Sequence, residues 1–167
     1  MWKSILLALL LVGVGVVGRM LPHPPNFTPI EAIALFGGAW FSPIWLSLLL
    51  PITIMAITDL LLGWHSLWPF TWGAMGVGAL VGRYLMEPLR FFSVAGAAVL
   101  QATIFFLLTN FGVWVKGYYG YSLSGLASCY LAAIPFYHYQ VMGALTYSTI
   151  FWGVSYAFYH RFQLVRR

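Results

Sequence analysis

The sequence predicts an all-α membrane protein of about six transmembrane helices, on the grounds of its composition and the length of its uncharged stretches. Hydrophobic residues make up 62% of the 167 residues and charged residues only 7%, whereas a soluble domain carries about 25% charged residues. Eight Lys or Arg and three Asp or Glu are too few to cover a surface that faces water. These numbers exclude a cytoplasmic enzyme, a nucleic-acid-binding domain and a disulfide-linked secreted module. At roughly 20 residues per crossing, residues 1–167 are expected to form a single transmembrane domain.

The first helix is expected from Trp2 to Met20. The uncharged run from Ser4 to Gly18 follows Lys3 and has the length of a signal-peptide core. A small-residue cleavage site is missing, and the rigid segment Pro22–Pro25 follows instead. We therefore expect an uncleaved first transmembrane helix.

The uncharged interval between Glu31 and Asp59 is too long for one helix and is interrupted at Ser42-Pro43. Two helices are expected in it, over residues 29–41 and 43–63. Thr28 is the expected N-cap of the first, because its hydroxyl can accept a free backbone N–H. Pro51 should kink the second, because it removes one backbone hydrogen bond.

A loop over residues 63–70 mixes turn residues with tryptophan and histidine, which is typical of a water interface. The helix expected next, over 71–86, carries Ala74, Gly78 and Gly82 at four-residue spacing. Such a stripe of small side chains lets another helix approach closely, although the sequence does not name the partner.

The charge-free run over 91–115 is long enough to span a bilayer with some tilt. The remaining uncharged stretch is divided by Pro135. We expect a short interfacial helix over 123–134, capped by Ser122, and a sixth span over 138–159.

The distribution of cations predicts the orientation. With the N-terminus inside, the cytoplasmic side holds Lys3, Arg83, Arg90, Arg161, Arg166 and Arg167, and the outer side holds Arg19 and Lys116. The positive-inside rule then places both termini in the cytoplasm. The outer loops, over 21–28, 64–70 and 116–137, contain most of the polar and aromatic candidates.

The acids inside the expected spans are the first candidates for function, since an unpaired carboxylate in hydrocarbon is costly. Glu31 could simply favour the positive end of a helix dipole. Asp59 is expected at a similar depth to Glu31 and Arg19, so an ion pair among the three could hold three helices together. A role in contacting a ligand stays open for both acids.

Other polar residues have two interpretations each. The proline-rich segment over 21–29 is stiff and holds His23, Asn26 and Thr28 in fixed directions, either as a site or as a tether. Asn110 is a polar amide in an apolar run that bonds either another helix or a ligand. Aromatic residues of the outer loops form either an interfacial belt or the lining of a pocket for a flat organic molecule.

Neither a metal site nor a catalytic site is predicted. The residues His23, His65, His138 and Cys129 are all expected on the outer side, but no local pair has ligand spacing. A buried small side chain is the favoured role for Cys129. The chain has no G-x-S-x-G or H-E-x-x-H motif and no glycine-rich phosphate loop. We therefore expect neither an enzyme nor a bound cofactor.

Four segments carry a resemblance to a known family. They are L-P-H-P-P-N-F-T-P-I-E-A-I-A-L-F-G-G-A at 21–39, T-D-L-L-L-G-W-H at 58–65, T-N-F-G-V-W at 109–114 and C-Y-x-x-A-I-P-F at 129–136. In these segments the chain resembles an uncharacterised family of small bacterial six-helix membrane proteins. That family is similar in architecture to the substrate-binding S components of energy-coupling-factor transporters.

The resemblance implies a protein of the bacterial inner membrane that binds a micronutrient or vitamin-like solute from the outer side. It also implies a separate transmembrane coupling subunit, and the composition already excludes nucleic acid as a partner. The expected ligand-binding residues are His23, Asn26, Thr28, Glu31, Asp59, His65, Trp68, Asn110, Trp114, Tyr118, Cys129 and Tyr130. The alternative is an accessory subunit of a larger respiratory or photosynthetic membrane complex, since small-residue stripes would serve helix docking equally well.

Overall fold

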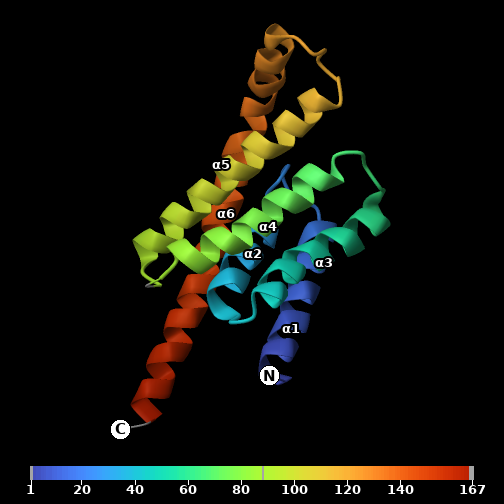
Figure 1. Ribbon diagram of the computed structural model, residues 1–167. Coiled ribbons are helices and arrows are strands. Elements are labelled where there is room, and N and C mark those ends of the chain that lie inside the picture. Colours follow the sequence, from blue (N-terminus) through green and yellow to red (C-terminus); the bar gives the residue numbers. More distant parts are fainter. Residues whose placement is uncertain (1, 88, 166–167) are drawn as a thin grey trace.

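A computed structural model describes residues 2–87 and 89–165, with side chains described as far as residue 157, and these residues form α-helices and loops. The helices are α1 (Trp2–Met20), α2 (Ile30–Trp40), α3 (Ile44–Leu62), α4 (Trp68–Leu85), α5 (Phe91–Val115) and α6 (Leu123–Val165). Successive helices run in alternating directions, so both ends of the chain lie at the same end of the bundle (Figure 1). The α3–α4 and α5–α6 loops lie toward the opposite end.

The bounds of α1, α2, α3 and α5 agree with the expected ones to within one residue. α4 starts three residues earlier than expected, at Trp68, because Pro69 occupies its first turn, where a missing N–H costs nothing. Pro51 lies inside α3, as expected.

The predicted division of the C-terminal segment at Pro135 is wrong, because residues 123–165 form one continuous helix. Pro135 removes one backbone hydrogen bond of α6. Contacts with α5 before and after Pro135 keep the helix continuous. Before it, the Tyr130 hydroxyl donates to the carbonyl of Leu107 at 2.7 Å. After it, the Gln140 amide donates to the carbonyl of Ala102 at 3.2 Å. The helix does begin as expected, with the N–H of Gly125 donating to Ser122 Oγ at 3.0 Å.

The predicted capping of α2 by Thr28 is also wrong. The helix begins at Ile30, so the N-cap position is Pro29, which makes no side-chain cap hydrogen bond. Thr28 lies one residue too early, and its own N–H donates to the carbonyl of Asn26 at 3.1 Å. Asn26 has a φ of 60°, so the chain turns sharply here before it enters the helix.

The short helix α2 lies at the centre of the bundle and contacts each of the other five helices. Residues 30–38 are all buried, as expected for a helix that is apolar on every side. Two apolar clusters lie against it, one with α1 and α3 around Ile54 and one with α4, α5 and α6 around Ala98. At 11 residues, α2 is roughly 16 Å long, so its N-terminus lies among the longer helices.

Glycines bring the backbones of α2 and α4 into direct contact. A Cβ atom added at Gly38 would collide with the carbonyl oxygen of Ala79, and one added at Gly82 would collide with that of Leu35. The small-residue stripe of α4 therefore serves two neighbours, because Gly78 faces the Gln101 side chain of α5.

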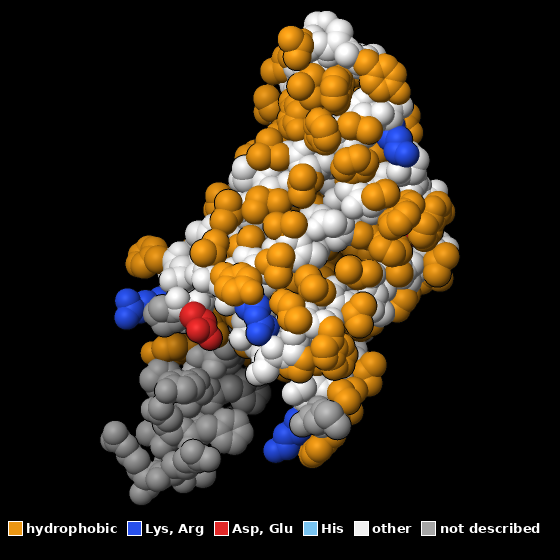
Figure 2. Space-filling view, viewed as in Figure 1, with side chains coloured by type: hydrophobic (Ala, Val, Ile, Leu, Met, Phe, Trp, Pro, Cys, Tyr) orange, Lys and Arg blue, Asp and Glu red, His pale blue; other side chains and the backbone are white. Residues whose placement is uncertain are grey.

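The outer surface of the bundle is largely apolar. Figure 2 shows hydrophobic side chains over most of one face, with the charged ones near its edges. Large exposed side chains include Leu9, Leu60, Phe92 and Ile150, each at least half exposed. Among the described residues, three helices are long and apolar enough to cross a membrane: α1, α3 and α5.

The contact between α2 and α4 makes a stability prediction. Gly82→Ala should lower the free energy of unfolding by about 1–3 kcal/mol, because the new methyl group meets backbone that cannot move aside. Gly96→Ala in α5 is the matched control, since open space surrounds that Cβ position. It should leave stability unchanged or raise it by up to about 1 kcal/mol, the difference in helix propensity. Thermal unfolding in detergent would compare them, and equal melting temperatures would contradict the close approach.

Candidate functional site

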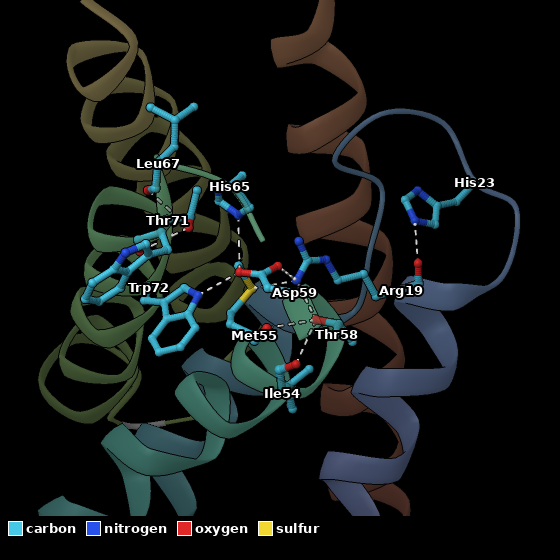
Figure 3. Close-up of polar contacts among 11 residues, drawn as sticks. Arg19, His23, Ile54, Met55, Thr58, Asp59, His65, Leu67, Thr71 and Trp72 are labelled. Carbon is cyan, nitrogen blue, oxygen red and sulfur yellow. Dashed lines mark hydrogen bonds and ion pairs between the residues drawn. The ribbon is translucent and has the colours of Figure 1, made fainter. Parts of the chain in front are cut away.

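An ion pair joins the end of α1 to the end of α3. Arg19 Nη1 lies 2.7 Å from Asp59 Oδ1, and the same nitrogen donates to the Thr58 hydroxyl and to the Met55 sulfur (Figure 3). Arg19 is near the last residue of α1, where a cation is favoured by the helix dipole. This is the pairing expected from the similar depths of the two residues, although Glu31 takes no part in it.

The second oxygen of Asp59 is held from the α3–α4 side (Figure 3). The indole N–H of Trp72 donates to Asp59 Oδ2 at 2.8 Å, and His65 Nε2 lies 3.2 Å from the same oxygen. Trp72 in turn packs against Trp64 and Trp68 in a cluster of three indoles. Asp59 is 1% exposed, so these contacts stabilise a carboxylate that water does not reach, and they connect α1, α3 and α4.

A pocket of about 270 Å³ opens beside this ion pair. Its polar lining comes from the end of α1, the proline-rich loop and the start of α2, with Thr71 from α4. The lining residues are Arg19, His23, Asn26, Thr28, Ile30, Glu31, Met55, Leu62, Thr71, Met75 and Phe105.

A second pocket of about 220 Å³ lies between α5, α6 and the same loop. Its lining combines amides and hydroxyls with aromatic rings. The residues are Asn26, Leu67, Thr71, Phe105, Phe106, Thr109, Asn110, Val113, Ala133, Phe136, Tyr137 and Gln140. Asn26, Thr71 and Phe105 line both pockets, so the two are adjacent.

A buried hydrogen bond connects the two pockets. The Gln140 amide, on the wall of the second, donates to Glu31 Oε1, on the wall of the first, at 2.7 Å. Glu31 is 4% exposed and Gln140 1%. Among the residues the structure describes, Glu31 Oε2 has no hydrogen-bond partner. The carboxyl group is therefore only half satisfied by the protein.

The predicted ligand-binding residues divide into three groups. His23, Thr28 and Glu31 line the first pocket, Asn110 the second, and Asn26 both. Asp59 pairs with Arg19, which lines the first pocket, and His65 contacts Asp59. The remaining five, which line neither pocket, are Trp68, Trp114, Tyr118, Cys129 and Tyr130.

These five make contacts that stabilise the loop end of the bundle. The indole N–H of Trp114 donates to the carbonyl of Ser122 at 3.2 Å, and the Tyr118 hydroxyl lies 3.4 Å from that of Ser66. Buried Cys129 donates to the carbonyl of Asn110 at 3.3 Å. The Asn110 side chain itself donates to a carbonyl of its own helix, that of Phe106, at 2.8 Å.

Several residues of the site were not predicted from the sequence. Thr71, Phe105 and Gln140 line the pockets, and Trp72 bonds Asp59. A signal existed for Gln140, which is a polar amide in an apolar run like Asn110. Nothing in the sequence distinguishes Phe105 from the 12 other phenylalanines.

The candidate metal ligands are dispersed. Within residues 2–87 and 89–157, no three His, Cys, Asp or Glu side chains gather closely enough to hold a metal ion. His23 uses its ring nitrogens on the loop, at 2.7 Å from the carbonyl of Pro24 and 3.2 Å from that of Arg19.

Breaking the Arg19–Asp59 pair should destabilise the bundle. We expect Asp59→Asn to cost about 2–3 kcal/mol, less than a fully buried pair, because the Arg19 side chain is 20% exposed. Arg19→Gln should also lower the free energy of unfolding. The double variant should lose less stability than the sum of the two single losses, with a coupling energy of about 1–3 kcal/mol. Thermal unfolding of the parent protein, the two single variants and the double variant in detergent would measure this coupling energy. Strictly additive losses of stability would argue against a direct pair.

Comparison with known proteins places the chain in a family. No curated protein and no solved structure is significantly similar to it. One family does match, over residues 1–165, and it is described as a family of unknown function. Because the match covers nearly the whole sequence, the chain belongs to the DUF6580 family.

Proposed function

We propose that this protein is a multi-pass membrane protein that binds a small, vitamin-like solute from the outer side and helps to import it. The observation that carries the proposal is the pair of adjacent pockets connected by the buried Glu31–Gln140 hydrogen bond. Ligand sites are concave, with apolar walls and a few placed polar groups, and hold about 300–1,000 Å³. The two pockets together fit this description.

The apolar exterior supports placement in a bilayer. Helices α1, α3 and α5 are long and apolar enough to span, and leucine and phenylalanine side chains are exposed around the bundle. Such a surface would aggregate in water unless lipid or a partner covered it. The cation distribution favours cytoplasmic termini, which puts the loops beside the two pockets on the outer side.

The resemblance to S components of energy-coupling-factor transporters agrees with this arrangement. In the proposed function the chain supplies solute binding, and a separate transmembrane coupling subunit supplies the energy. Fold-level likeness does not identify the solute, so the site itself must be tested.

Native mass spectrometry of protein extracted gently from its own membranes is the direct test. We expect a bound small molecule of defined mass. Stoichiometric protein partners without any such molecule would contradict the proposal and favour the accessory-subunit alternative.

A blocked pocket gives the matching control. Thr71→Trp places an indole at the boundary of both pockets and should abolish the bound mass. The Thr71 hydroxyl donates only to carbonyls of its own helical turn, so folding should be retained. Thr53→Trp, at an exposed position of α3, should keep the bound mass. Equal ligand occupancy in the two variants would show that the molecule binds elsewhere.

The proposed orientation is tested with single cysteines in a Cys129→Ser background. We expect Ser66→Cys, in the exposed α3–α4 loop, to react with a membrane-impermeant thiol reagent in intact cells. Ser42→Cys, in the exposed α2–α3 loop, should react only after permeabilisation. The reverse labelling pattern would show the opposite orientation.

A further inference from the structure

We propose that the solute is a small organic cation, with a protonated nitrogen that carries hydrogen and a flat ring. Its nitrogen would bond Glu31, and its ring would lie among the aromatic side chains of the second pocket. This inference rests on the proposed function and adds the chemical class of the ligand.

The charges around the first pocket favour a cation. Three of its lining residues are ionisable: Arg19, His23 and Glu31. Arg19 already has a counter-ion, because Asp59 lies 2.7 Å away and lines neither pocket. His23 is exposed, and its ring nitrogens lie near the carbonyl oxygens of Pro24 and Arg19, to one of which a neutral ring can donate. Glu31 is thus an acid without a cation among the residues the structure describes, and a bound monocation would balance it.

The hydrogen bonds of Glu31 point to a ligand that donates. Gln140 donates to Oε1, and Oε2 is buried with no partner in the described part of the chain. A buried carboxylate with an unsatisfied oxygen and no cation beside it is unfavourable, so the empty pocket favours the neutral acid, which gives up its proton when a cation binds. A ligand N–H would supply the missing hydrogen bond, and charge-assisted hydrogen bonds are the stronger kind.

The second pocket provides a place for the ring. Phe105 stands at the boundary of the two pockets, and Phe106, Phe136 and Tyr137 line the second. Phe106 and Tyr137 are in contact, with ring centroids 4.9 Å apart. Such rings attract organic cations and pack against flat molecules. Gln140 lines this pocket and bonds Glu31, and the two pockets adjoin at Asn26, Thr71 and Phe105, so the proposed molecule would lie across that boundary.

Three probes of nearly equal shape separate charge from size. Benzamidine is a flat ring with a protonated N–H group, benzamide is its neutral counterpart and benzoate is an anion. Ligand-observed NMR titrations with the full-length protein in detergent would compare their affinities. We expect benzamidine to bind best and benzoate not to bind.

The decisive variant is Glu31→Gln, which keeps the side-chain size and an oxygen for the Gln140 hydrogen bond. It should weaken benzamidine binding by roughly tenfold or more, the loss typical of removing one partner of a buried charge pair. Benzamide binding should change little. The matched control is Glu87→Gln, which removes the same charge at an exposed residue outside both pockets and should leave benzamidine binding unchanged. Thermal unfolding would verify that both variants are folded.

The outcomes distinguish this inference from the proposed function. If benzamide or benzoate binds as tightly as benzamidine, or if Glu31→Gln binds benzamidine like the parent protein, the cation class is wrong. Failure of all three probes to bind also overturns it. A bound natural solute in the native mass spectrum would, in each of these cases, still support solute binding.

Discussion

The close approach of α2 and α4 is the constraint on which the arrangement depends. With no side chain at Gly38 or Gly82, the two backbones touch, and the short helix α2 is held at the centre of the bundle in contact with the other five helices. A helix of about three turns cannot cross the full height of its neighbours. The end of the proline-rich loop therefore reaches into the bundle, with Pro29 buried and residues 21–26 exposed, and the loop lines both pockets. The contact of α2 with α4 at these glycines thus determines where the two pockets lie, although the glycines are remote from the pockets.

The entry of this loop also explains why two acids with similar sequence surroundings have different roles. Asp59 lies near the C-terminus of α3, where Arg19 at the end of α1 and Trp72 of α4 reach it. Both of its oxygens have partners within the protein. Glu31 lies in the first turn of α2, where its side-chain hydrogen-bond partner is an amide, that of Gln140. The amide forms a hydrogen bond with one oxygen of Glu31 and brings no positive charge. The second oxygen can therefore still bond an external partner.

The helices were largely predictable because charged residues mark their ends. Lys3 and Arg19 flank the uncharged run of α1, and Arg90 and Lys116 flank that of α5, so both were located correctly. Pro135 misled the prediction because the contacts that keep α6 continuous come from α5, through Tyr130 and Gln140. The spacing of residues in the sequence does not reveal contacts between two helices. The similar depth of Arg19 and Asp59 in their helices was enough to predict that they pair. The partner of Glu31 is Gln140, 109 residues away along the chain, and depth alone does not identify it.

In the proposed function, the difference between the two acids gives a protein with a largely apolar surface a site for a solute. A fully paired acid stabilises the bundle and offers nothing to a solute. An acid held by one neutral amide costs stability while the pocket is empty, and that cost is recovered when a ligand supplies the second hydrogen bond and the opposite charge. In the proposed function, selectivity follows from the site itself, because an anion would face an acid and a neutral molecule would bring no counter-ion for Glu31. In the proposed function, Asp59 therefore has the structural role and Glu31 the recognition role.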